Sequence, residues 1–237
     1  MKNNIVQSFD IETGGMIIGQ HPLMAIGTSV FLHKSDGTFE LLDSMEVHFP
    51  SDEKDYDPDT LLWWKSQDTW EKVREDPISL SEGAALLRDF NKKWQIEAIV
   101  NRKMSYSILV DNAWYDGMWI SWFLCKYAEG GYPLRKSYVP AYDKGGHIKI
   151  THVIDVNQRI QALADAGLTI GLKNLQYKTA HDHTPMHDSM GIAEKWFYYC
   201  AKVKDMRKVN LERANANLNT NLNTNLNTNL NTNHSEG

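Results

Sequence analysis

The chain has 237 residues, of which 42% are hydrophobic, and it carries a formal net charge of −5 with a sequence pI near 6.0. A chain of this length buries enough surface to form a core, and one α/β domain is the simplest organisation. The acidic balance argues against a protein that coats nucleic acid through many Lys and Arg contacts to phosphates. It does not argue against an enzyme whose site is acidic because it holds metal.

Two further properties bear on where the protein works. No apolar segment approaches the roughly 20 residues that span a bilayer, and the first residues lack the pattern of a signal peptide, so we expect a cytoplasmic protein without membrane contact. The two cysteines, Cys125 and Cys200, lie in apolar helix-like runs and are expected to be reduced core residues.

The N-terminal part predicts a meander of three strands, because apolar runs are separated by short loops rich in Gly and Asp. These strands are expected at residues 5–11, 23–32 and 39–49. The remainder predicts helices with a few strands between them. The helices are expected at 58–73, 79–94, 115–127, 155–166 and 188–203, and the strands at 96–100, 107–110 and 147–154. Ser79 and Glu82 are spaced as a capping box, and Asp155 is expected to cap the helix that follows it.

The C-terminal segment is of a different composition, with the unit Asn-Leu-Asn-Thr repeated through Thr232. One leucine in four residues, with no aromatic side chain, cannot bury enough surface to offset the entropy of ordering. We therefore predict a folded domain at residues 1–210 and a disordered tail at 211–237. The alternative is a stacked assembly segment, since asparagine ladders stabilise cross-β stacking.

Carboxylates at the end of the first strand are the first chemical signal. Asp10 and Glu12 are two residues apart, so on a strand their side chains leave the same face. Two such carboxylates repel each other unless a cation neutralises them, and hard oxygen ligands suit Mg²⁺ or Mn²⁺. Solvent-exposed charge is the alternative, but the apolar neighbours Val6, Phe9 and Ile11 predict a buried central strand.

Two more acids are ambiguous when taken alone. Asp116 and Asp188 each stand at the start of an expected helix, where an acid is favoured by the helix dipole without any catalytic role. Their order relative to the first strand changes that interpretation, because it matches a known succession of motifs.

That succession resembles the DnaQ-like 3′–5′ exonucleases of the DEDDh type. Phe9-Asp10-Ile11-Glu12-Thr13 is similar to the first motif of that superfamily, Asn112-Ala113-Trp114-Tyr115-Asp116 to the second, and His183-Thr184-Pro185-Met186-His187-Asp188 to the third. The sequence departs from the motifs at Asp111, where His is common, and at Pro185 and Ser189, where small residues are common. A further segment, Thr60-Leu61-Leu62-Trp63-Trp64-Lys65-Ser66-Gln67, resembles the branch containing phage exodeoxyribonuclease A and bacterial exoribonucleases.

The resemblance implies an RNase H-like fold, with a mixed sheet of about five strands flanked by helices. It implies a metal-dependent exonuclease that removes nucleoside 5′-monophosphates from the 3′ ends of single-stranded DNA or RNA, and it admits a homodimer. Asp10, Glu12, Asp116 and Asp188 would hold two Mg²⁺ or Mn²⁺ ions, with His183 as general base near neutral pH. The residues expected to contact substrate are Thr13, Trp63, Trp64, Asn112 and Tyr115, with one tryptophan packed inward and the other free to stack on a base. A catalytically silent nucleic-acid-binding module of the same fold is the rival from another class.

A zinc site is the alternative for the histidines. His181, His183 and His187 have spacings that can bring their nitrogens together. The absence of nearby cysteine, and the helix start between the first and last of them, favour one catalytic histidine with two exposed neighbours.

Overall fold

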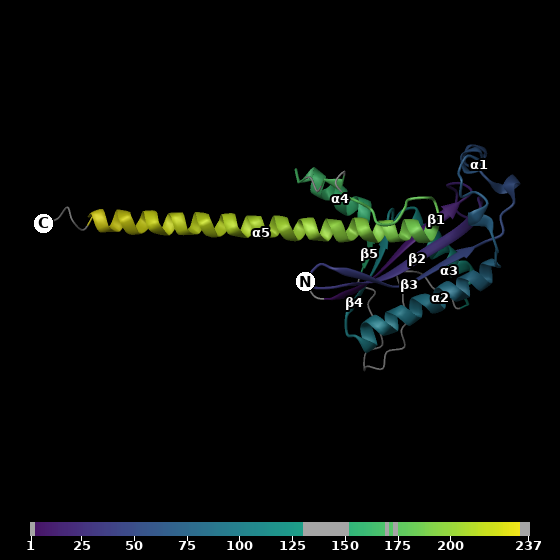
Figure 1. Ribbon diagram of the computed structural model, residues 1–237, viewed down its shortest axis with the longest axis horizontal. Helices are drawn as coiled ribbons and strands as arrows, with labels where there is room; N and C mark the ends of the chain where they lie inside the picture. Colours follow the sequence, from purple (N-terminus) through teal and green to yellow (C-terminus); the bar gives the residue numbers. More distant parts are fainter. Residues whose placement is uncertain (1–2, 130–151, 169–170, 173–174, 233–237) are drawn as a thin grey trace. The chain divides into compact units, whose positions relative to one another are not determined.

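The protein is described by a computed structural model that covers residues 3–129, 152–168, 171–172 and 175–232 (Figure 1). Its internal contacts divide the chain into two units, residues 1–197 and residues 198–237. The first unit contains the sheet and every residue expected in the site. Within the described residues, no helix combines the length and the apolar character needed to cross a bilayer.

Five strands of the described chain form one mixed sheet in the order β3-β2-β1-β4-β5. They are β1 (Asn4–Thr13), β2 (Leu23–His33), β3 (Phe39–His48), β4 (Ser105–Val110) and β5 (His152–Asp155). The first three form the predicted antiparallel meander, whereas β4 and β5 run parallel to β1. The α/β class and the RNase H-like mixed sheet are therefore confirmed. Residues 147–151 of the strand expected at 147–154 lie outside the described residues.

The helices are α1 (Pro58–Lys65), α2 (Leu80–Ile96), α3 (Asp116–Tyr127), α4 (Val156–Asp165) and α5 (Pro185–Thr232). Short 3₁₀ turns cover η1 (Glu53–Asp55) and η2 (Lys72–Arg74), and a π-helical turn covers η3 (Glu97–Asn101). Both expected caps are present: the Ser79 side chain accepts a hydrogen bond from Glu82 N–H, and Asp155 accepts one from Gln158 N–H.

Three expected elements differ from the structure. The helix expected at 58–73 ends at Lys65, and its last residues form the separate turn η2. The strand expected at 96–100 is helical, because no Gly or Pro lies between Ala84 and Asn101 and α2 continues directly into η3, which buries Ala98 against the core. The last helix begins at Pro185 rather than Asp188, since proline suits the first turn of a helix.

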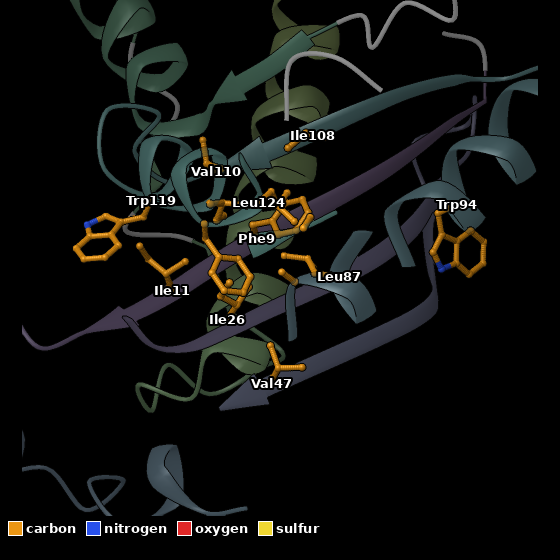
Figure 2. Close-up of a cluster of buried hydrophobic side chains, with 14 of the residues drawn as sticks. Phe9, Ile11, Ile26, Val47, Leu87, Trp94, Ile108, Val110, Trp119 and Leu124 are labelled. Atoms are coloured by element: carbon orange, nitrogen blue, oxygen red, sulfur yellow. The ribbon is translucent and has the colours of Figure 1, made fainter. Parts of the chain in front are cut away.

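Apolar side chains pack against both faces of the sheet. On one face, β1, β2 and β4 pack against α2 and α3, as Figure 2 shows for Phe9, Leu87 and Leu124. On the other face a smaller cluster joins Val6 and Leu109 to the start of α5. Along β1 the residues alternate between these faces, with Ile5, Phe9 and Ile11 toward α2 and α3.

The second unit continues α5 from Tyr198, and the structure keeps it helical through Thr232. The described side chains from 207 to 216 are exposed. The division into a folded domain at 1–210 and a tail at 211–237 stays a prediction. Both cysteines are free; Cys125 is exposed on α3 rather than a core residue, because α3 directs its buried side chains elsewhere.

Candidate functional site

The alternation of β1 places its two acids on the face that α5 covers. Val6 packs in the cluster on that face, and Asp10 and Glu12 follow it at even intervals. The preceding apolar residues hold β1 at the centre of the sheet, between β2 and β4. The carboxylates are thus fixed on a rigid strand at the edge where the parallel strands end.

Gly27 allows α5 to approach this strand. It pairs with Asp10 across the β1–β2 ladder, so a side chain there would project toward α5. A Cβ atom at this position would lie 2.0 Å from the carbonyl carbon of Pro185 and 2.2 Å from the nitrogen of Met186. The first turn of α5 therefore occupies the space that any other residue would need, which brings Asp188 to the carboxylates of β1.

Two polar contacts fix the first turn of α5 in this position. The Met186 N–H donates to Glu46 Oε2 at 2.8 Å, so a carboxylate from β3 satisfies one of the free donors at the helix start. Although burial favours its protonation, hydrogen bonds from His48 and Met186 hold the pKa of Glu46 below its usual value. Ser189 Oγ lies 2.7 Å from Ser29 Oγ in a buried contact between α5 and β2.

The second motif reaches the same edge of the sheet from β4. Asp116 is the first residue of α3, and its Oδ2 accepts a hydrogen bond of 2.9 Å from Asn112 N–H. Asp155, at the end of β5, accepts a hydrogen bond of 2.9 Å from Ala113 N–H and so holds this loop. Asp10 and Glu12 from β1, Asp116 after β4 and Asp155 from β5 therefore lie at the carboxyl ends of their strands.

Three of the four expected ligands converge closely. Carboxylate oxygens of Asp10, Glu12 and Asp188 lie within 4.8 Å of one another. Asp116 is outside that group, yet its charge raises the pKa values of both Asp10 and Glu12. The predicted set is thus brought together as three clustered carboxylates with a fourth close by.

The electrostatics of this cluster favour a bound cation. Burial raises the pKa of Asp10 and of Glu12 well above their ordinary values, and the neighbouring carboxylates raise them further. Burial likewise raises the pKa of Asp116, which is 6% exposed, to about 7, and nearby Asp111 adds to the effect. Burial also raises the pKa of Asp188, against the opposing charges of His181 and His183. A divalent ion would offset these repulsions, and an all-oxygen donor set fits Mg²⁺ or Mn²⁺.

His183 lies beside Asp188, with its Nδ1 3.9 Å from Asp188 Oδ2. Its backbone has a φ of 57°, a left-handed conformation that is costly for a residue with a Cβ atom. Its ring packs edge-on against Trp63, with ring centroids 4.9 Å apart. The His181 ring contacts the His183 ring as well, with ring centroids 4.8 Å apart, so the histidine is held by its backbone and by two ring contacts.

The two tryptophans of α1 have different environments, as expected. Trp64 is 1% exposed, and its indole N–H donates to the Thr13 carbonyl oxygen at 3.0 Å. Trp63 is 43% exposed. Burial excludes direct substrate contact by Trp64, so its position indicates that it supports the end of β1.

The other expected substrate residues lie around the same strand end. Thr13 Oγ1 lies 2.6 Å from the Tyr115 hydroxyl, which ties the first motif to the second. Asn112 is exposed, and its Oδ1 accepts a hydrogen bond of 3.0 Å from Trp114 N–H.

A pocket of about 240 Å³ opens on the acidic cluster and is lined on one side by the first turns of α5. Asp10, Asp188 and His181 line it, together with Asp111 and Lys195. Lys195 Nζ lies 2.6 Å from Asp111 Oδ1, so the Asp111 carboxylate forms an ion pair with Lys195.

Sequence reasoning missed three residues that build the site: Gly27, Glu46 and Lys195. Gly27 and Glu46 carry no local sequence signal, because their roles depend on contacts with residues that are 158 and 140 positions away, respectively. His181 was noticed only as part of the zinc alternative. Lys195 follows Asp188 by two turns of α5, and this spacing was the signal in the sequence that the two side chains lie on the same face of the helix.

No protein-family model and no curated protein matches this sequence. Among solved structures, the chain is similar to an exonuclease I whose structure is described as suggesting how processivity is achieved, with a TM-score of 0.51 and 12% identity over 81% of this chain. It is also similar to Escherichia coli exonuclease I in complex with a dT13 oligonucleotide (TM-score 0.48, 14% identity, 88% of this chain). A full-length 3′-exonuclease gives a TM-score of 0.48 at 13% identity, with 83% of this chain and 81% of that one covered. The chain spans only 40% and 42% of the two exonuclease I chains, so the likeness concerns the fold.

Proposed function

We propose that the protein is a metal-dependent 3′–5′ exonuclease that acts on single-stranded DNA and releases nucleoside 5′-monophosphates. The observation that carries this proposal is the convergence of Asp10 and Glu12 from β1 with Asp188 from α5, with all three carboxylates within 4.8 Å. The similarity to exonuclease I supports the fold on which such a site is built. The order of the three motifs supports placement in the DEDDh group, and the segment from Thr60 to Gln67 supports the branch that contains phage exodeoxyribonuclease A and bacterial exoribonucleases.

Asp10, Glu12 and Asp188 would hold one Mg²⁺ or Mn²⁺ ion, and Asp10 and Asp116 a second. When bound, two such ions neutralise the scissile phosphate and stabilise the attacking and leaving oxygens of an in-line displacement. The raised pKa values of these acids fit this role, because the negative charge that the fold concentrates there is costly without a cation.

His183 would accept the proton of the attacking water. Imidazole titrates near neutral pH and therefore suits proton transfer under cellular conditions. The contact with Trp63 and the left-handed backbone limit the positions that the ring can take. Asp188 is close enough to stabilise the positive charge that the ring would acquire.

Trp63 would stack on the terminal base, since its indole is partly exposed and adjoins His183. Thr13 and Tyr115, whose hydroxyl groups contact each other, would help to position the terminal nucleotide together with Asn112. Trp64 would act indirectly, by holding the Thr13 carbonyl. We further propose that the protein acts in the cytoplasm.

The test replaces Asp10 or Asp188 with Ala. Each variant should lose Mg²⁺-dependent release of mononucleotides from a single-stranded oligonucleotide by at least roughly 100-fold, because each loses a direct ligand. Far-ultraviolet circular dichroism should match the wild type. As a matched control, Asp59→Ala removes an exposed acid from the first turn of α1 and should keep the activity. Retained activity in Asp10→Ala or Asp188→Ala would contradict the proposal, and a wild type that cuts nothing with Mg²⁺ or Mn²⁺ would favour the silent binding module.

A further inference from the structure

A second group of potential ligands adjoins the acidic cluster and shares one residue with it. His181, His183 and Asp188 each offer a ligand atom, and these atoms lie within 4.8 Å of one another. The first group offers only oxygen, whereas this one offers two imidazole nitrogens and one carboxylate oxygen. Asp188 belongs to both.

The distances within this second group suit a small tetrahedral ion. His181 Nδ1 lies 2.8 Å from Asp188 Oδ1, and His183 Nδ1 lies 3.9 Å from Asp188 Oδ2. Zinc bonds of about 2.0–2.1 Å at tetrahedral angles place two ligand atoms roughly 3.3 Å apart. The two observed separations, one to each oxygen of Asp188, lie within about 0.6 Å of that value.

The approach of His181 to Asp188 is close but is not a well-aligned hydrogen bond. Asp188 Oδ1 is buried and has no hydrogen-bond partner of good geometry within the described residues, although the His181 ring nitrogen is 2.8 Å away. Such an orphaned carboxylate oxygen in a buried place requires a partner. His181 itself is 73% exposed, so an ion from solvent has access to it.

The third histidine, His187, contacts a different carboxylate. His187 Nδ1 lies 2.9 Å from Asp182 Oδ2, and Asp182 also accepts a hydrogen bond from the Thr184 hydroxyl. These hydrogen bonds lower the pKa of Asp182 despite its partial burial, and they pin the loop that carries His181 and His183. The ligand set is therefore not the three histidines that the sequence suggested for zinc.

We propose that His181, His183 and Asp188 form an inhibitory site for a borderline transition-metal cation such as Zn²⁺. Two imidazoles and one carboxylate select such a cation over Mg²⁺, which prefers oxygen ligands in an octahedral arrangement. The inhibitory part rests on the proposed function. An ion bound there uses the His183 nitrogen that faces Asp188 and withdraws Asp188 from the oxygen cluster. The exonuclease then loses its base and one ligand of its activating ion together.

The binding test uses isothermal titration of the metal-free full-length chain with ZnCl₂. His181→Ala should weaken Zn²⁺ binding by at least about tenfold, because it removes one of three ligands. His187→Ala is the matched control: it removes a neighbouring histidine outside the group, leaves the two hydrogen bonds from Thr184 to Asp182 that hold the loop, and should bind Zn²⁺ as the wild type does. Asp10→Asn disables the oxygen cluster alone and should also keep the Zn²⁺ site. Circular dichroism establishes that each variant is folded. Equal Zn²⁺ affinity in wild type and His181→Ala, or equal weakening in the two histidine variants, would overturn the proposal.

The inhibition test measures how much Zn²⁺ halves the Mg²⁺-dependent nuclease rate, relative to each variant's own rate without Zn²⁺. That concentration should rise at least about tenfold in His181→Ala and stay unchanged in His187→Ala. The two hypotheses fail differently. A chain that binds Zn²⁺ in the predicted pattern but cuts no nucleic acid would refute the nuclease and keep the site. A working nuclease whose Zn²⁺ binding ignores His181 would refute the site and keep the nuclease.

Discussion

Replacing Asp116 with Asn should stabilise the metal-free protein at pH 8 and leave its stability at pH 4 almost unchanged. Burial raises the pKa of this carboxyl from 3.8 to about 7. Between those values the folded state keeps a proton that the unfolded state has released, so the free energy of unfolding falls as the pH rises. Above about pH 7 the folded protein bears the whole cost of an ionised, buried carboxylate.

The size of the effect follows from the shift. Roughly three pKa units at about 1.4 kcal/mol each give up to about 4 kcal/mol that Asn should recover at pH 8. The substitution keeps an oxygen that can accept the hydrogen bond from Asn112 N–H, so the loop should not lose its anchor.

The assay is urea unfolding of both proteins at pH 4, 6 and 8 in the presence of a chelator. Asp59→Asn, an exposed acid in the first turn of α1, serves as the control and should change the stability by no more than about 1 kcal/mol at any of these pH values. Adding Mg²⁺ at pH 8 should stabilise the wild type more than Asp116→Asn, because ligand binding to the folded state adds to its stability. A difference between Asp116→Asn and wild type that is the same at pH 4 and pH 8 would refute the reasoning.

Four further substitutions probe the rest of the site. Gly27→Ala should lower the nuclease rate at least roughly 100-fold, because its Cβ would push α5 and Asp188 away from β1, and the loss of a geometry by about 1 Å can cost that much. His183→Asn should lower kcat about 100- to 10,000-fold with little change in KM, since Asn tolerates the left-handed backbone but cannot act as the base. Trp63→Ala should weaken the binding of a single-stranded oligonucleotide by roughly 1–3 kcal/mol, measured by fluorescence anisotropy with Ca²⁺. Trp64→Ala should instead lower the free energy of unfolding by about 3–5 kcal/mol.

Matched controls separate these effects from general damage. Gly117→Ala adds the same methyl group at the start of α3, where the nearest atom is an ordinary 3.9 Å away, and should leave the fold intact. If Gly27→Ala were as active as Gly117→Ala, close packing of α5 would not position Asp188. If Trp63→Ala lost stability as Trp64→Ala does, its role would be structural.

The sequence predicted the central strand well because alternation is a local property. The pattern from Val6 to Glu12 was enough to place two acids on one face, and the structure has them on the face that α5 covers. Asp116 and Asp188 were different. Each is a plausible helix-start acid, and only the resemblance of ordered motifs connected them to the strand.

The remaining features depended on long-range contacts that no local pattern encodes. Gly27 matters because of Pro185, and Glu46 because of Met186, in both cases across the space between the sheet and α5. Residues 96–100 were read as a strand from their β-branched side chains, but the uninterrupted helix before them decided their conformation. The sequence predicted that one of Trp63 and Trp64 is buried and the other exposed, but it did not show which one is buried.

The most direct measurement of the central claim is a time course on matched single-stranded DNA and RNA oligonucleotides that carry a label at the 5′ end. With Mg²⁺ present, the account predicts a ladder of DNA products that shorten one nucleotide at a time from the 3′ end, with nucleoside 5′-monophosphates released and no ladder from Asp188→Ala. If RNA were shortened faster than DNA, RNA would be the preferred substrate and the proposed mechanism would stand. Loss of the 5′ label as the first product, internal cuts, or a ladder that Asp188→Ala also produces would contradict the account.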